Sequence, residues 1–358
     1  MKKNGTRISI RTNENLFFFF ILFVIDSMKE QLNLLLTYAM SKHTSDIHFY
    51  VDKDLLSIQF RTMEGLEKIN QDIWKPSLFE YLKFISGFDL TNPFIPQSGQ
   101  FSWEYKGQEI FCRFSVILNQ SIQTGVLRIL STKLDIPLDD LTYDAYAIDF
   151  FKKICHARNG LVLTSGPTNS GKTTTIHALL HEIATHSKYK IVSLEDPVEI
   201  EDSNYLQLQI NEEQGFTYEK GITELMRHDP DIIFIGEIRN AFCARSLVNA
   251  ALSGHMVIST IHAGNCLEAI ERLLDFGVGI NDLKSTLSAM ISQRLYTSKN
   301  GKKVCTYEIM ESETISEILE TFEYPKGFKT LFKKVMEGVE QGYICDEQAI
   351  YDLQNWKE

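Results

Sequence analysis

The sequence is poor in the patterns that build metal sites, disulfide frameworks and basic surfaces. Its six cysteines include no C-x-x-C pair and no histidine at the spacing of a zinc site, so we expect reduced, packed thiols. Lys and Arg number 36 against 47 Asp and Glu, and the formal net charge of -11 argues against a broad surface that binds nucleic-acid phosphates. At 358 residues and 44% hydrophobic composition, the chain is long enough for two globular domains.

A long apolar run is also missing, and this bears on the N-terminus. Four basic residues within the first eleven precede residues 17–25, whose nine apolar side chains are too few to span a bilayer as a helix. No small-residue cleavage site follows them cleanly, which disfavours a secretory signal peptide. An amphipathic helical pattern begins at Met28. We therefore expect residues 1–27 to be a non-native or disordered N-terminal extension, with a peripheral membrane anchor as the alternative.

The chain does contain a phosphate-binding loop. Gly166–Thr173 fits the pattern G-x-x-x-x-G-K-[ST]; the apolar run 161–164 enters it, and the helix-prone run 173–184 leaves it. In such a loop, backbone N–H groups and the helix N-terminus face a polyphosphate, Lys172 contacts the terminal phosphates, and Thr173 offers its hydroxyl to magnesium. A chance match of a Gly- and Ser-rich turn is the alternative. The residues predicted to bind a nucleoside triphosphate are Gly166, Pro167, Thr168, Asn169, Ser170, Gly171, Lys172, Thr173 and Thr174.

The loop belongs to a region of fully apolar strands. Residues 161–164, 190–194, 231–235 and 256–260 lack polar alternation, which predicts strands that are buried on both faces in a parallel sheet covered by helices. Ligands bind at the carboxyl ends of such strands. Polar side chains that directly follow these runs are therefore candidate site residues.

Three of the runs are followed by such side chains. Glu195 and Glu199, in the segment E-D-P-V-E, are predicted to position Mg²⁺ and water, although an acidic turn can also serve solubility. Glu237 is the predicted catalytic carboxylate that orients or deprotonates the attacking water, with a helix-initiating acid as the alternative. His262 is predicted to sense the terminal phosphate, against the simpler interpretation of a surface or core histidine.

A change of pattern divides the chain into two domains. Residues 28–135 are typical of a small α+β domain, and residues 136–147, which follow a proline-containing acidic segment, are predicted to be a linker. Residues 148–358 are predicted to form an α/β domain that ends in helices. After about residue 265 the pattern favours helices at 268–276, 281–293 and 328–341.

The motifs are more specific as an ordered set. The segments G-x-x-x-x-G-K-T-T-T, L-E-D-P-V-E, D-P-D-I-I-F-I-G-E-I-R and S-G-H-x-V-x-S-T-I-H resemble the Walker A, Asp, Walker B and His boxes of the secretion and type IV pilus ATPase family. The likeness extends to Ser45–His48, Pro96–Gly99 and Gln293–Leu295, so it covers most of the chain from Met28 to about residue 295. The resemblance implies an α/β fold: a RecA-like P-loop NTPase core with a smaller N-terminal α+β (PAS-like) domain, using ATP and Mg²⁺.

The resemblance also implies roles for three arginines. In similar proteins two arginines of the N-terminal domain reach the phosphates, and Arg113 and Arg128 match those positions. Arg239 ends the Walker B box and is implied to belong to the catalytic group. A mobile guanidinium would neutralise charge that develops on the transferred phosphoryl group and would couple hydrolysis to domain closure.

Departures from the family pattern indicate a subfamily. Asn240 and Phe242 stand where family members commonly have acids, and Asn169 stands where relatives often carry glycine, although asparagine tolerates a left-handed backbone. The four-cysteine zinc loop and the long N-terminal extension of many members are missing. The chain therefore looks like the minimal, ComGA-type competence ATPases of Gram-positive bacteria.

The functional prediction follows from this resemblance. It implies a homo-hexameric ATPase that is cytoplasmic, peripheral at the inner face of the cell membrane, and that powers assembly of a DNA-uptake pseudopilus. The implied partner is a polytopic membrane platform protein, and no direct contact with nucleic acid is expected. The alternatives are a pilus retraction ATPase, a RecA-like nucleic-acid motor, and a scaffold that binds ATP without hydrolysing it.

Overall fold

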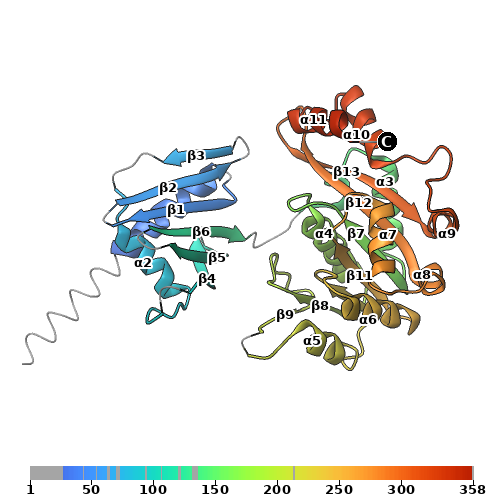
Figure 1. The fold of residues 1–358 in the computed structure, drawn as a ribbon, viewed down its shortest axis with the longest axis horizontal. Coiled ribbons are helices and arrows are strands. Elements are labelled where there is room, and N and C mark those ends of the chain that lie inside the picture. The colour runs from blue at the N-terminus through green and yellow to red at the C-terminus, as the bar shows by residue number, and fades with distance from the viewer. Residues whose placement is uncertain are drawn as a thin grey trace, which may run out of the picture. The chain divides into compact units, whose positions relative to one another are not determined.

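The described residues form two compact units, one within Met1–Thr132 and one within Lys133–Glu358 (Figure 1). The extension expected at residues 1–27 lies outside the described residues, except for Ser27, which begins the first helix. No helix among the described residues combines the length and the apolar composition needed to cross a bilayer. The computed structural model describes residues 27–42, 44–53, 55–62, 65–69, 73–92, 95–105, 107–119, 122–130, 136–212 and 214–356.

The first unit is an antiparallel sheet with helices packed on one face. Its six strands have the order β3-β2-β1-β6-β5-β4. Helix 27–41 and α2 (Pro76–Ile85) contribute apolar side chains to one core with the inner face of the sheet, where Phe49, Phe79 and Phe114 make edge or tilted ring contacts. The strands are β1 (Asp46–Asp52), β2 (Leu55–Thr62), β3 (Gly65–Ile69), β4 (Gln97–Tyr105), β5 (Gln108–Asn119) and β6 (Ile122–Leu130).

The second unit is a seven-stranded sheet between two layers of helices. The order is β13-β12-β7-β11-β10-β8-β9, and every neighbouring pair is parallel except β12 with β13. Every residue of β7, β8, β10 and β11 is buried except the first of β7, as their lack of polar alternation predicted. The strands are β7 (Gly160–Ser165), β8 (Ile191–Glu195), β9 (Leu206–Gln209), β10 (Ile232–Ile235), β11 (Met256–Ile261), β12 (Leu287–Thr297) and β13 (Lys303–Glu311).

Helices cover both faces of this sheet (Figure 1). Helices α3 and α4 share one core with one face, and α5 to α9 share a second core with the other face, because successive strand residues point to opposite sides. Helices α10 and α11 form a smaller core with β12 and β13. The helices are α3 (Ala145–Ile154), α4 (Lys172–His186), α5 (Tyr218–Leu225), α6 (Ala241–Leu252), α7 (Cys266–Asp275), α8 (Ile280–Thr286), α9 (Ser312–Thr321), α10 (Leu331–Glu340) and α11 (Glu347–Asn355).

The helix predicted at 281–293 is wrong in its second half. Helix α8 ends at Thr286, and the following residues form β12, an inner strand that pairs with β7 and β13. Adjacent Met290 and Ile291 are both fully buried, one in each of the two large cores. An apolar run of this kind fits a buried strand as well as a buried helix, so periodicity alone did not separate them. The strand β13 was not predicted at all.

The segment predicted to be a linker, 136–147, lies within the second unit. It contains the short helical turn η1 (Leu138–Asp140), and Leu138 and Leu141 are buried in the core beneath α3 and α4. The backbone N–H of Cys305 donates a 3.0 Å hydrogen bond to the carbonyl of Leu141. The two leucines hold this stretch on the domain, which the acidic composition of the segment did not reveal.

Candidate nucleotide-binding site

The phosphate loop connects β7 to α4 and uses three residues with positive φ. Gly166 and Gly171 have φ of 146° and 87°, and Asn169 has φ of 64°, the left-handed conformation that an asparagine side chain tolerates. A Cβ atom on Gly166 would lie 2.7 Å from the carbonyl oxygen of Gln293, so the loop packs too closely on β12 for any other residue. The loop therefore has the backbone that its sequence motif predicts.

Lys172 begins α4 and folds back over the loop. Its side-chain Nζ donates hydrogen bonds of 2.9 and 2.8 Å to the carbonyls of Gly166 and Pro167. Burial lowers the pKa of Lys172 to about 8; the negative charge of Glu237 opposes this shift and the positive charge of Arg294 adds to it. The ammonium is thus partly desolvated, and a phosphate group beside it would favour its charged form.

Side chains from β12 and β13 support the phosphate loop and the helix α4 that follows it, and no role was predicted for them. The buried amide of Gln293 on β12 donates a 2.7 Å hydrogen bond to the carbonyl of Ser170. The hydroxyls of Tyr307, on β13, and Thr175, on α4, lie 2.8 Å apart. The resemblance had included Gln293 as part of a motif, whereas Tyr307 lies on a strand that was not predicted.

Glu237 lies at the centre of a cluster formed by the ends of three adjacent strands. Its Oε1 is 3.3 Å from Nε2 of His262, which follows β11, and its Oε2 is 3.4 Å from Nε of Arg239. Arg239 in turn donates a 2.8 Å hydrogen bond from Nη1 to Asp196, which follows β8, and stacks on the ring of Tyr218 at 5.1 Å. The Glu237 side chain is 28% exposed, so its carboxylate can reach solvent. Of this cluster, Asp196 belongs to the E-D-P-V-E segment whose acids were predicted to lie at the mouth of the phosphate site, whereas Tyr218 was not predicted.

Glu195 is not part of this cluster, and its carboxylate is buried against other partners. It is 3% exposed, and its carboxylate accepts hydrogen bonds from Ser193 (2.6 Å) and Gln207 (3.1 Å). Its Oε2 also lies 3.2 Å from Nε2 of His177 on α4. Strand alternation turns Glu195 toward α4, so its charge is satisfied inside the domain. The prediction had treated every acid of this turn as facing the nucleotide.

The remaining predicted metal ligands are differently placed. Thr173 lies in the first turn of α4 and is half-buried, and the described residues give its hydroxyl no hydrogen-bond partner. Glu199 is half-buried, and its charge raises the pKa of Lys172, which places it near the loop. In the described part of the chain, no three His, Cys, Asp or Glu side chains are arranged to hold a metal ion. Any ion here would need oxygens from a bound phosphate.

Comparison with known proteins assigns the family. Residues 25–341 match the sequence model of the family described as type II/IV secretion system protein. The chain belongs to this family. The predicted class of secretion ATPase is thereby confirmed.

Two relatives match this secretion ATPase over different shares of their own length. The competence protein ComGA of Bacillus subtilis (strain 168) is 31% identical over 351 residues, covering 89% of this chain and 96% of that protein. The type II secretion system ATPase E of Vibrio cholerae serotype O1 is 33% identical over 269 residues, covering 74% of this chain and 53% of that protein. The chain thus matches about half the length of the second relative and nearly all of the first.

Solved structures confirm the predicted fold class of this secretion ATPase. The Legionella pneumophila ATPase DotB has a TM-score of 0.73 at 19% identity and covers 90% of this chain and 94% of that one. The pilus retraction motor PilT with bound ADP also has a TM-score of 0.73, at 23% identity, with coverage of 89% and 96%. The RecA-like core with a smaller N-terminal domain is therefore shared with both.

The two arginines implied to reach the phosphates lie in the first unit of this secretion ATPase. Arg113 on β5 and Arg128 on β6 are directly opposite each other in the antiparallel ladder, and both side chains are exposed. Arg128 donates a 2.7 Å hydrogen bond from Nε to Asp46, and Arg113 donates one of 3.2 Å to Ser98. Both guanidiniums therefore occupy one face of the sheet, and their contact with nucleotide stays a prediction.

Proposed function

We propose that this chain is an ATP-hydrolysing motor that powers assembly of a competence, or DNA-uptake, type IV-like pseudopilus. One observation carries the proposal: the similarity to the competence protein ComGA extends over nearly the full length of both chains. The site geometry supports the enzymatic part, because Glu237 contacts His262 and its charge acts on Lys172 of the phosphate loop. The likeness to a pilus retraction motor is below 25% identity and supports the fold alone.

In the proposed mechanism, the phosphates of ATP occupy the loop from Gly166 to Thr173. The N–H groups of the loop and the N-terminal end of α4 face the phosphate oxygens, and Lys172 exchanges its contacts with the loop carbonyls for contacts with phosphate. Because a neighbouring anion favours the ammonium, binding restores the charge that burial disfavours. Lys172 then neutralises charge on the terminal phosphates.

Thr173 and Glu199 are the residues that fit Mg²⁺ here, Thr173 through its hydroxyl and Glu199 through its half-buried carboxylate. The ion, when bound with the nucleotide, would neutralise charge shared by the two terminal phosphates. Glu195 is left out of this proposed set because its carboxylate is buried and meets Ser193, Gln207 and His177. This assignment replaces the set of three ligands predicted from the sequence.

Glu237 orients the attacking water and accepts its proton on a carboxylate oxygen. Arg239 and His262 hold that carboxylate from two sides, and the contacts of Arg239 with Asp196 and Tyr218 keep the guanidinium from swinging away. His262 follows β11 and is exposed enough, at 43%, to meet the terminal phosphate as well as Glu237. Departure of the phosphate would then alter this contact.

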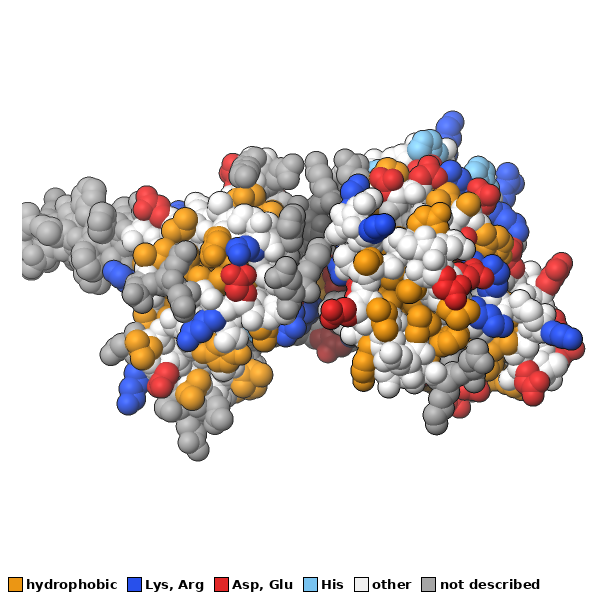
Figure 2. Space-filling view, turned by 90° about the horizontal axis from the view of Figure 1, so that it is seen from above, with side chains coloured by type: hydrophobic (Ala, Val, Ile, Leu, Met, Phe, Trp, Pro, Cys, Tyr) orange, Lys and Arg blue, Asp and Glu red, His pale blue; other side chains and the backbone are white. Residues whose placement is uncertain are grey.

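The proposed assembly is a homo-hexamer on the cytoplasmic face of the membrane, held there by a polytopic platform protein. Arg113 and Arg128 would close over the nucleotide and add positive charge to the site. No direct contact with nucleic acid is proposed. On the face shown in Figure 2, acidic and basic side chains of the second unit are mixed and no continuous basic surface forms, in keeping with the net charge of -11.

The test is steady-state phosphate release by the purified protein and by Lys172→Ala, followed by complementation of a deletion strain. We expect Lys172→Ala to lower turnover by at least about 100-fold and to fail to restore DNA uptake. A Lys172→Ala protein that hydrolyses ATP as fast as the parent would contradict the assigned site. A deletion strain that still assembles the pseudopilus but cannot withdraw it would favour the retraction motor.

A further inference from the structure

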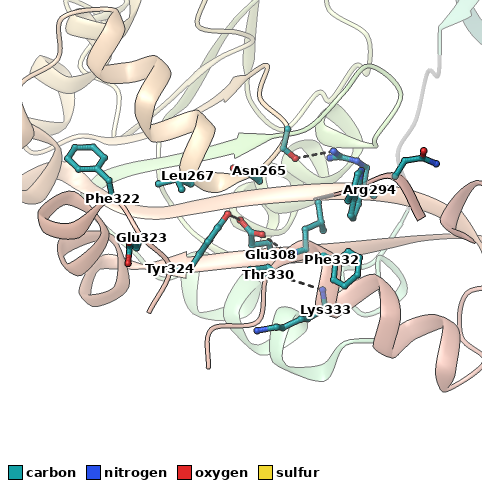
Figure 3. A pocket seen from close by; sticks show the side chains of 14 residues that line it. Asn265, Leu267, Arg294, Glu308, Phe322, Glu323, Tyr324, Thr330, Phe332 and Lys333 are labelled. Carbon is teal, nitrogen blue, oxygen red and sulfur yellow. Dashed lines mark hydrogen bonds between the residues drawn. The ribbon is translucent and has the colours of Figure 1, made fainter. Parts of the chain in front are cut away.

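Arg294 links strand β12, on which the phosphate loop packs, to the loop that carries His262 (Figure 3). It lies on β12, where its Nη1 donates a 3.0 Å hydrogen bond to the carbonyl of Gln293 and its Nη2 donates one of 3.0 Å to the carbonyl of Gly264. Gly264 lies two residues after His262. The guanidinium therefore bridges β12 and the loop that carries His262, alongside the Ser292 hydroxyl, which donates a 3.5 Å hydrogen bond to the same Gly264 carbonyl.

The carbonyls of Gln293 and Gly264 both belong to segments that contact the proposed nucleotide site. The Gln293 side chain supports the phosphate loop at Ser170, and its backbone oxygen is the atom that would meet a Cβ on Gly166. On the other side, the His262 loop is in contact with Glu237. The positive charge of Arg294 also contributes to the lowered pKa of Lys172, which places the guanidinium near the loop lysine.

The opposite face of the guanidinium is covered by the C-terminal segment. The centre of the Arg294 guanidinium lies 5.1 Å from the ring of Trp356, the residue that follows α11. Helix α11 is tied to β12 by Asp352, which accepts a 2.8 Å hydrogen bond from Tyr296, and by Asp346, which accepts one of 2.7 Å from the Thr297 N–H. The C-terminal helix therefore contacts the strand that supports the phosphate loop.

A pocket of about 750 Å³ opens beside this contact. Arg294, Trp356 and Gly264 all line it, together with Asn355 at the end of α11, as Figure 3 shows for the labelled Arg294. Because Trp356 borders open space on one side, its ring can leave Arg294 without disturbing the main cores. Arg294 would then be hydrated, and its hold on the two carbonyls would weaken.

We propose that Arg294 is a positioning residue through which Trp356 and the C-terminal helix α11 set the rate of ATP hydrolysis. With Trp356 stacked on it, the guanidinium is held in the orientation that joins the Gln293 and Gly264 carbonyls. Displacement of the C-terminal segment relaxes the His262 loop and slows turnover. The proposal rests on the ATPase function and goes beyond it by adding a control point outside the nucleotide site.

A double-mutant cycle on kcat tests this coupling. We expect Arg294→Ala to lower kcat about 10-fold and Trp356→Ala about 3-fold, with a smaller change in KM, because the misplaced loop acts on the chemical step. In the Arg294→Ala background, Trp356→Ala should have no further effect, since its only route is lost. Should Arg294→Ala fold poorly, Arg294→Lys takes its place, because lysine keeps the charge but cannot bridge the two carbonyls.

Two controls separate coupling from general damage. Tyr351→Ala removes an exposed side chain from α11 and should leave kcat unchanged. Lys284→Met breaks an exposed ion pair with Glu320 that joins α8 to α9 and involves neither carbonyl, so any effect that it has should multiply with that of Trp356→Ala. Multiplying effects for the Arg294 and Trp356 pair would overturn the proposal.

Fluorescence gives a readout that does not require turnover. Trp74 and Trp103 are the other tryptophans of the chain, so the difference between the parent and Trp356→Phe isolates the emission of Trp356. We expect ADP to change this emission in the parent and to leave it unchanged in Arg294→Lys. No ADP-dependent change in the parent would overturn the coupling, whereas coupling in a protein without hydrolysis would overturn the ATPase function instead.

Discussion

The ends of two adjacent strands, β8 and β10, carry acids with opposite environments. Glu195 ends β8 and is 3% exposed, with hydrogen bonds from β8 and β9 and a contact with α4. Glu237 follows β10 by one glycine, is 28% exposed, and its carboxylate contacts Arg239 and His262 at the mouth of the site. A position at the carboxyl end of a strand therefore does not by itself identify a catalytic acid. The face to which the side chain points, and the donors that it meets there, decide whether the acid is structural or chemical.

The largest expected effect comes from Glu237→Gln. The amide keeps the size of the side chain but cannot accept the proton of water, so we expect kcat for ATP hydrolysis to fall by about 10² to 10⁴-fold. Binding of a fluorescent ATP analogue should persist, because the phosphate loop is unchanged. Retained hydrolysis in this variant would move the base to another residue and remove the contrast between the two strand ends.

The next effect is the pH dependence of ATP binding. The pKa of Lys172 is lowered from 10.5 to about 8, so in the nucleotide-free protein the lysine loses its positive charge above pH 8. When ATP is bound, the neighbouring phosphate keeps the lysine protonated. The Kd for ATP should therefore rise by about tenfold per pH unit above pH 8 in equilibrium binding. Lys172→Arg, which stays charged, should show no such slope, and a slope in that variant would assign the titration to another group.

The lowered pKa of Lys172 has the opposite effect on folding: a rise in pH that weakens ATP binding stabilises the nucleotide-free protein. Between pH 8 and 10.5 the unfolded chain holds a proton on Lys172 that the folded chain has lost. This group alone therefore makes the nucleotide-free fold more stable as the pH rises through that window. Urea unfolding of the parent and Lys172→Met at pH 8 and pH 10 measures the difference, and a parent that loses stability relative to Lys172→Met would contradict the sign.

Glu195→Gln is the matched partner of Glu237→Gln. Because the carboxylate accepts from Ser193 and Gln207 and contacts His177, an amide leaves at least one donor badly paired, at a cost of about 1 to 3 kcal/mol in unfolding free energy. We expect kcat to change by less than about tenfold. Chemical denaturation and phosphate release measured on the same preparation decide it, and a 100-fold loss of kcat at unchanged stability would restore Glu195 to the catalytic group.

The difference between Glu195 and Glu237 also shows which parts of the site could be predicted from the sequence. The phosphate loop, the buried parallel strands and the acid at Glu237 are encoded within short segments, so motif and periodicity predicted them. The partners of Glu195 lie on α4 and β9, and nothing local to β8 shows that His177 and Gln207 meet it. Pairing across the sheet decides this, and no single segment contains that information.

The support behind the loop was hidden for a second reason. Residues 287–297 are apolar enough for a helix, so the strand β12 and its role in holding the loop through Gln293 could not be separated from a helical alternative. The next strand, β13, was missed with it, and so was the contact between Tyr307 and Thr175. The resemblance to a family preserved the Gln293 motif but assigned it no task.

Tyr307→Phe gives the smallest expected effect. It tests a structural contact behind the phosphate loop without changing any proposed catalytic group. It deletes one hydroxyl from a contact of 2.8 Å with Thr175 on α4 and leaves the packed ring in place, so the cost should be about 1 kcal/mol. For a unit of this size that corresponds to a fall of about 2 to 4 °C in Tm. The control is Tyr343→Phe, which removes a hydroxyl from a tyrosine that is 48% exposed and should not shift Tm. Because the contact anchors α4 and does not touch phosphate, kcat should stay within about twofold of the parent.

A large loss of kcat at unchanged Tm would contradict this prediction. It would mean that the Tyr307 hydroxyl acts in catalysis as well as in supporting α4.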